Sequence, residues 1–102
     1  PQANRFTSVQ SVVAQKNSLF VLDPSSPMMK GVVGTAALYE FDLQTNQLKR
    51  TWRFPSAVAP KKSYLNDLRI DDELNKIFIT DSGTGGIVVL DMTTGKAKRY
   101  LE

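Results

Sequence analysis

The sequence predicts an all-β protein made of two similar four-stranded antiparallel units, each the size of one β-propeller blade. Three observations support this prediction. The apolar runs are short and rich in strand-forming residues, clusters of turn-forming residues separate them, and the pattern occurs twice in 102 residues. A repeat of about 40 to 50 residues is typical of propeller blades. A plain β-sandwich or β-barrel is the alternative that the strand pattern would favour without the repeat.

The first unit takes up residues 9–55 and follows a polar, aperiodic stretch, 1–8, that we interpret as an N-terminal arm. Its second and third strands are separated by the loop Asp23–Gly34, which holds two prolines and two glycines. Residues 56–63 form a connector, because proline interrupts the hydrogen-bond ladder of a sheet. The predicted strands are Val9–Ala14, Leu19–Leu22, Ala37–Leu43 and Leu48–Phe54.

The second unit, residues 64–102, repeats the first. Residues 9–12 match 65–68 at an offset of 56, 19–23 match 77–81 at 58, and 38–42 match 87–91 at 49. The fall from 58 to 49 is nine residues, which the longer loop of the first unit absorbs. The order of strands is therefore the same in both units.

Turn chemistry agrees with the repeat. Asp42 and Asn46 in the first unit stand where Asp91 and Gly95 stand in the second. Asn and Gly tolerate a positive φ, and a preceding Asp can bond the turn backbone. We therefore expect two equivalent hairpins.

The glycine-rich stretch 80–86 is interpreted as a third tight hairpin, in which Asp81 bonds backbone amides and Gly83 and Gly86 shape the turn. A phosphate-binding loop is excluded, because no Lys-Ser/Thr pair follows at the required spacing. The last strand of each unit is rich in basic residues, which suits an outer edge strand that must not pair with other chains. These basic residues are Lys49, Arg50 and Arg53 in one unit and Lys98 and Arg99 in the other.

Composition excludes several classes of chemistry. The chain has no Cys and no His, which excludes disulfides, thiolate zinc sites, a Cys nucleophile and His-based triads within it. A net charge of +3 is too small to indicate nucleic-acid binding, and no apolar run reaches the length of a membrane span. Residues 67–91 hold six acids and two bases, a net charge of −4, so the remainder carries +7. This local acidity favours a cation or a cationic ligand.

The candidate site lies where the innermost strands begin, because these ends face the central channel of a propeller. Gln10, Asn66 and Asp67 are the residues expected there. Amide and carboxylate oxygens are the ligands that calcium prefers, so Asn66 is a candidate metal ligand. The structural alternative is that Asp67 pairs with Arg69 or caps a turn.

Four stretches carry a resemblance to a known family: SVQSVV, LFVLD, LYEFDLQTNQLKRTWRFP and YLNDLRID…IFITDSGTGGIVVLD. They resemble the major royal jelly protein and Yellow family, with bacterial members looking most similar. The resemblance implies two adjacent blades of a six-bladed, exported propeller, either secreted or periplasmic. More distantly, the chain is similar to the gluconolactonase and SMP-30 group of calcium-dependent propellers. Asn66-Asp67 stands where that group places a metal-binding asparagine.

The resemblance implies a scaffold whose channel binds a small molecule or a cation. A calcium-dependent lactonase or esterase is one alternative, and a storage or interaction protein without a small-molecule site is another. We expect the remaining blades to come from the same polypeptide, from a cleaved piece, or from a homotrimer of this chain. A fragment is favoured over the trimer, because the two units differ so much in sequence. Two blades alone should leave two apolar sheet faces bare.

Overall fold

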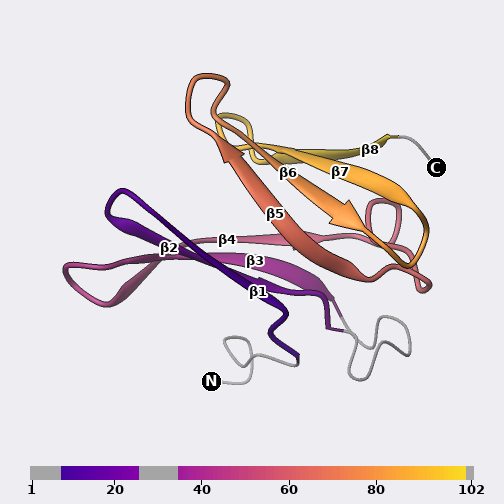
Figure 1. Cartoon of the computed structure of the whole chain (residues 1–102), viewed down its shortest axis with the longest axis horizontal. Helices are drawn as coiled ribbons and strands as arrows, with labels where there is room; N and C mark the ends of the chain where they lie inside the picture. The colour runs from indigo at the N-terminus through magenta and orange to yellow at the C-terminus, as the bar shows by residue number, and fades with distance from the viewer. Residues whose placement is uncertain (1–7, 26–34, 101–102) are drawn as a thin grey trace.

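The computed structural model describes residues 8–25 and 35–100, and within them every regular element is a strand. The strands form two four-stranded antiparallel sheets, each connected in simple chain order (Figure 1). The first sheet contains β1 (Ser11–Gln15), β2 (Ser18–Asp23), β3 (Ala36–Asp42) and β4 (Gln47–Phe54). The second contains β5 (Leu65–Asp71), β6 (Lys76–Asp81), β7 (Gly86–Asp91) and β8 (Lys96–Tyr100). The predicted fold class is confirmed.

The pairing register reproduces the repeat found in the sequence. Val21 lies between Val12 and Tyr39 in the first sheet, and its equivalent Ile79 lies between Leu68 and Val88 in the second. The offset between the two units changes from 56 to 58 at their first hairpins. The turn between β5 and β6 is two residues longer than the turn between β1 and β2. The two sheets are thus copies with one altered turn.

Some predicted strand limits are wrong by one or two residues. The first strand begins at Ser11 and not at Val9, although the Gln10 amide still donates to the Leu22 carbonyl at 3.0 Å. The third strand ends at Asp42, where the turn begins and the Asn46 amide donates to the Asp42 carbonyl at 2.8 Å. Asp23 belongs to β2 and not to the loop. The predicted arm up to residue 7, the loop residues 26–34 and the last two residues lie outside the described part of the chain.

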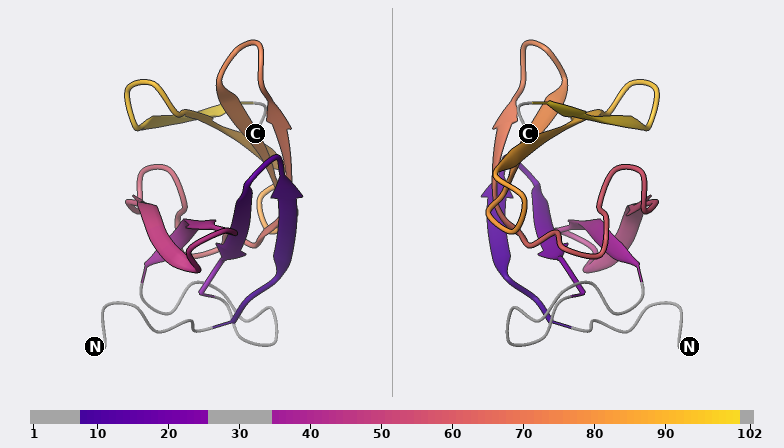
Figure 2. Two further views of the ribbon diagram at one scale, coloured as in Figure 1. Left: turned by 90° about the vertical axis from the view of Figure 1, so that its left-hand side faces the viewer. Right: turned by 90° about the vertical axis from the view of Figure 1, so that its right-hand side faces the viewer.

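The two sheets pack face to face and spread apart like a fan. They approach each other at β1 and β5 and diverge towards β4 and β8 (Figure 2). One continuous core fills the space between them, and the connector adds Val58 and Ala59 to it. Its largest members are Phe20, Leu22, Leu38, Trp52 and Phe54 from the first sheet, and Leu65, Leu68, Ile77, Ile79, Val88 and Leu90 from the second. This is the arrangement of neighbouring propeller blades.

The outer faces of the two sheets differ in exposure. On the first sheet, Val21 and Tyr39 are only 6% and 5% exposed. On the second, Phe78, Ile87 and Val89 are half-buried. The outer face of the first sheet is therefore bare only in part, since Val12 is 54% exposed on it and Leu19 and Phe41 are half-buried beside Val21 and Tyr39.

Candidate functional site

The innermost strands of the two sheets lie close together. β5 contacts both β1 and β2, so the beginnings of the two blades lie side by side. The Tyr64 hydroxyl, just before β5, donates a hydrogen bond to Gln10 Oε1, just before β1. The candidate residues of the first blade are thus tied to the start of the second.

Asn66 lies at an irregularity in the β5–β6 ladder. The register shifts between Leu65 and Asp67, which leaves Asn66 as a bulged residue without a partner across the strand. Its Oδ1 accepts a hydrogen bond from the Thr80 hydroxyl at 3.2 Å. Bulges often redirect side chains beside functional sites. Nothing in the alternation of apolar and polar residues could have indicated this one.

Asp67 is exposed and bonds the backbone of its own strand. Its Oδ1 accepts from the Leu68 amide at 2.9 Å. No ion pair joins it to Arg69, which is also exposed. Of the two structural alternatives, the structure therefore contains a backbone contact and not the expected ion pair.

The side-chain oxygens of Asn66 and Asp67 are of the type that a hard cation binds, but they are too few to complete its coordination. Calcium takes six to eight oxygen ligands. Among residues 8–25 and 35–100, no group of three or more acidic, His or Cys side chains could hold a metal ion. A calcium ion at Asn66 would therefore need most of its ligands from outside the described residues.

Three hairpins share one turn chemistry. In each hairpin an aspartate Oδ1 accepts hydrogen bonds from the backbone amides two and three residues later, at 2.8–3.4 Å. The three aspartates are Asp42, Asp81 and Asp91. Each hairpin then has a Thr whose Oγ1 accepts the amide two residues later. The residue between them has a positive φ: Asn46 (60°), Gly85 (83°) and Gly95 (77°). The left-handed position of the middle hairpin is Gly85, which the sequence analysis did not single out.

Gly83 and Gly86 have other roles. A Cβ on Gly83 would lie 2.0 Å from the Lys62 carbonyl oxygen, so this glycine permits a close backbone approach. Gly86 is the first, buried residue of β7 and pairs with Asp81. Gly83 lies in the turn as expected, and its amide donates to Asp81 Oδ1 at 3.0 Å, whereas Gly86 belongs to the strand; neither has a positive φ.

The match to a family agrees with this architecture. Residues 7–101 match the sequence model of the family described as Major royal jelly protein. The chain belongs to the major royal jelly protein family. A search of the curated proteins finds no match. The family is a β-propeller and is generally secreted, and this chain provides two of its blades.

Two blades do not close a propeller, so the rest of the ring lies outside the residues described here. In those residues, no helix is long and apolar enough to cross a membrane.

Among the described residues of this royal jelly family chain, Asp81 is the most deeply buried charged residue, with 1% of its surface exposed. Its carboxylate accepts from the Ser63 hydroxyl (2.6 Å), the Tyr64 amide (2.8 Å) and Arg99 Nη1 (2.9 Å). Burial alone would raise the pKa of Asp81, but the hydrogen bonds outweigh it and hold the pKa below its ordinary value. Asp81 therefore ties the connector, β6 and β8 together.

Arg99 does not act as a solvated edge charge. Its side chain is only 7% exposed, and besides Asp81 it donates to the Val58 carbonyl at 2.6 Å and to the Thr84 hydroxyl. The interpretation of the basic edge strand is wrong at this residue, because Arg99 stands opposite Val88 on the face of the second sheet that packs against the first. Lys96 and Lys98 of the same strand are exposed.

A second buried carboxylate, Glu40, was missed by the sequence analysis. It is 3% exposed, accepts from the Ser18 hydroxyl at 2.6 Å, and pairs with Arg50 at 2.8 Å. Arg50 also lies over the ring of Trp52, 4.7 Å from its centroid. Burial would raise the pKa of Glu40, but the Ser18 and Arg50 contacts and the charge of Lys49 lower it overall. Arg50 is an exposed charge on the edge strand β4, as expected, with 44% of its side chain exposed, but it also pairs with the buried Glu40.

Proposed function

We propose that the chain supplies two blades of a binding scaffold whose central channel takes a small molecule or a cation. One observation carries the proposal. Gln10 and Asn66 occupy equivalent positions of the repeat, at the beginnings of neighbouring innermost strands, and each presents an amide. Repeated polar groups at one end of the blades would form part of a ring around the channel in the complete propeller.

The chemistry of these groups favours a cationic ligand. Asn66 and Asp67 offer an amide oxygen and a carboxylate at the beginning of β5. Such a surface attracts an amine or a hard cation, including calcium. Calcium remains part of the proposal and not a finding, because its other ligands would come from other blades.

The first test measures cation binding. In the complete ring, Asn66→Ala should abolish calcium binding measured by calorimetry, because it removes one ligand from a site that tolerates few losses. Gln44→Ala is the matched control, since it removes an exposed amide at a distant turn. An unchanged isotherm for Asn66→Ala would favour the structural role of Asp67, in which it only bonds its own backbone.

The same preparation separates the alternatives. Turnover of lactones or esters that depends on calcium would favour the hydrolase of the gluconolactonase type. Calcium or amine binding without turnover would favour the scaffold. Binding of neither would favour a storage or interaction protein. We propose a site of action outside the cytoplasm, which the generally secreted family supports.

A further inference from the structure

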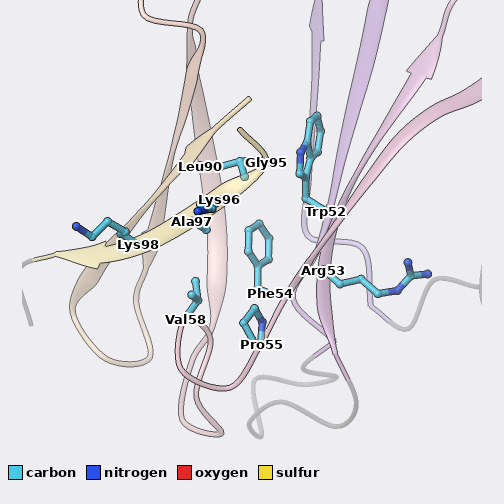
Figure 3. Close-up of a pocket in the computed structure, with 10 residues that line it drawn as sticks. All are labelled: Trp52, Arg53, Phe54, Pro55, Val58, Leu90, Gly95, Lys96, Ala97 and Lys98. Atoms are coloured by element: carbon cyan, nitrogen blue, oxygen red, sulfur yellow. The ribbon is translucent and has the colours of Figure 1, made fainter. Parts of the chain in front are cut away.

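The packing of the two blades shows how a side chain of one blade fills a space beside the next. Trp52 projects from β4, the outermost strand of the first sheet, and is 8% exposed. Its indole nitrogen lies 3.9 Å from the position that a Cβ on Gly95 would take, and Leu90 lines the same gap (Figure 3). Phe20 stacks on the indole at 6.5 Å between ring centroids. An aromatic side chain from β4 therefore packs beside the last hairpin of the following blade.

The outer face of the first sheet has a pocket at the equivalent place. It encloses about 270 Å³ and lies at the end of the face where β3 and β4 are joined. It is lined by Leu19, Val21, Phe41, Asp42, Leu43 and Asn46. The repeat equivalents of four of these residues belong to the core between the two sheets, namely Ile77, Ile79, Leu90 and Met92. Asn46 is the equivalent of Gly95, so this pocket stands where the second sheet receives Trp52.

An aromatic side chain suited to this pocket is present on the opposite side of the molecule. Tyr100 of β8 is the repeat equivalent of Trp52, because it pairs with Ile87 as Trp52 pairs with Leu38. It is 47% exposed, on the outer face of the second sheet. Tyr and Trp are the residues that most often anchor protein–protein contacts. The chain thus carries both halves of a contact that one copy cannot make with itself, since its two outer faces point away from each other.

The charges on the two outer faces are complementary. Lys98 is the repeat equivalent of Arg50, whose Nη1 donates to the Met92 carbonyl of the neighbouring blade at 3.5 Å. Met92 corresponds to Leu43, so the same packing between two copies brings Lys98 to the Leu43 carbonyl. Asp42 precedes Leu43 and lines the pocket. This pairing of a lysine with a carboxylate favours contact between the two different faces over contact between two copies of one face.

We propose that the outer face of the first sheet binds the outer face of the second sheet of another copy of this chain, head to tail. Tyr100 of one copy enters the pocket of the next copy beside Asn46, and Lys98 pairs with Asp42 at the edge of the pocket. Because the contact joins two different faces, it can continue from copy to copy until a ring closes. This association is independent of what the channel binds.

Two variants and their mixture test the head-to-tail arrangement by sedimentation equilibrium. Tyr100→Lys removes the aromatic side chain, and Leu43→Lys places a charge in the pocket; the two residues are 47% and 42% exposed, so both variants should fold. Each variant alone should associate about 30-fold or more weakly than the wild-type chain, the scale of a hot-spot residue. An equal mixture should form a dimer and nothing larger, because Tyr100→Lys keeps an intact pocket and Leu43→Lys keeps an intact Tyr100.

Two further variants distinguish this contact from non-specific association. Leu74→Lys changes another apolar residue, 57% exposed in the β5–β6 turn, and should associate like the wild type. Tyr100→Trp combined with Asn46→Gly reproduces the pair formed by Trp52 and Gly95 and should also associate like the wild type. A wild-type chain that is monomeric at every concentration would overturn the proposal and leave the pocket to a blade of another polypeptide. A mixture of the Tyr100→Lys and pocket variants that stays monomeric, or an equal loss with Leu74→Lys, would overturn it as well.

Discussion

At the scale of single residues, the blades depend on two buried carboxylates. Asp81 is paired with Arg99 from β8, and Glu40 with Arg50 from β4, so in each sheet the outermost strand supplies the guanidinium, which is buried for Arg99 and 44% exposed for Arg50. Removing one partner of such a pair leaves an uncompensated buried charge, which costs more than the pair contributes. These residues should therefore be sensitive to truncation.

Asp81→Ala should lower the free energy of unfolding by about 3–5 kcal/mol, because it leaves Arg99 without its carboxylate inside the blade. Urea denaturation measures the loss. Asp42→Ala is the matched control, since Asp42 bonds an equivalent but exposed turn and should cost about 1 kcal/mol. Similar losses for the two variants would contradict the special role of the buried pair.

Stability should also depend on pH in the acid range. The pKa of Asp81 is lowered from 3.8 and that of Glu40 from 4.5. A carboxylate whose pKa is lower in the folded state contributes stability that is fully present above its unfolded pKa. The contribution is lost as the pH falls through the folded value. The free energy of unfolding should therefore be level near neutrality and fall below about pH 4.5.

Glu40→Gln should flatten this acid limb, because an amide does not titrate. Urea denaturation at a series of pH values measures the slope. Glu73→Gln is the control, since Glu73 is an exposed turn residue and should leave the slope unchanged. An acid limb of Glu40→Gln that parallels the wild type would show that Glu40 does not contribute to it.

The Glu40–Arg50 pair could not be predicted from the sequence, because it depends on the register of two strands. Glu40 stands opposite Arg50 only because the β3–β4 register shifts between Glu40 and Phe41, which leaves Lys49 as the extra residue. A shift of one residue reverses the face on which every later side chain lies. Alternation along the strand cannot reveal it, and the bulge at Asn66 escaped for the same reason.

At the scale of elements, the strands were predictable and their ends were not. Short apolar runs and the repeat predicted two four-stranded antiparallel units, and the structure contains them. The ends are decided by turn hydrogen bonds, such as that from the Asn46 amide to the Asp42 carbonyl. The hairpin motif could have been extended to Thr84 and Gly85, since Asp81 begins the same Asp-x-x-Thr pattern as Asp42 and Asp91.

The β7–β8 turn offers a test of backbone strain. Gly95→Val should destabilise the protein by roughly 1 kcal/mol or more, because a β-branched residue is strained at a φ of 77°. Gly95→Asn should be mild, since Asn46 adopts a φ of 60° at the equivalent position. Thermal melting compares the two. Equal losses would mean that the positive φ does not govern this turn.

The glycine-rich hairpin separates strain from steric clash. Gly83→Ala should be much more damaging than Gly85→Ala, because its Cβ would lie 2.0 Å from the Lys62 carbonyl oxygen. At Gly85 a Cβ meets nothing within 4 Å, so only the positive φ of 83° opposes substitution. Urea denaturation of both variants measures the difference. A greater loss for Gly85→Ala would contradict the close approach at Gly83.

At the scale of the whole molecule, the chain is nearly but not fully closed on itself. Its radius of gyration is 12.8 Å, close to the value of about 13 Å for a compact domain of this length. It exposes 6216 Å², compared with about 5,700 Å² for a compact monomer of this mass. The excess of about 500 Å² would forfeit on the order of 10 kcal/mol if it were all apolar, which is an upper bound. That amount is comparable with the whole stability of a small domain.

The outer face of the second sheet is the part of this surface that a further blade would cover. Phe78, Ile87 and Val89 lie half-buried there, and Tyr100 is 47% exposed. They are the repeat equivalents of Phe20, Leu38, Glu40 and Trp52, which pack the first sheet against the second. The outer face of the second sheet is therefore equivalent in position to the inner face of the first sheet, which packs against a blade, and it is nearly as apolar.

The isolated chain should consequently associate through this face in a concentration-dependent manner. Light scattering across a dilution series should give masses above that of the monomer. Val89→Lys should restore the monomer, because it places a charge in the centre of the face. Leu74→Lys is the matched control, since Leu74 is 57% exposed in the β5–β6 turn and away from that face. A wild-type chain that stays monomeric and melts cooperatively at all concentrations would show that the two-bladed unit is stable without further blades. In that case the half-buried residues of the outer face would be ordinary surface, since a small domain leaves many apolar atoms exposed in any fold.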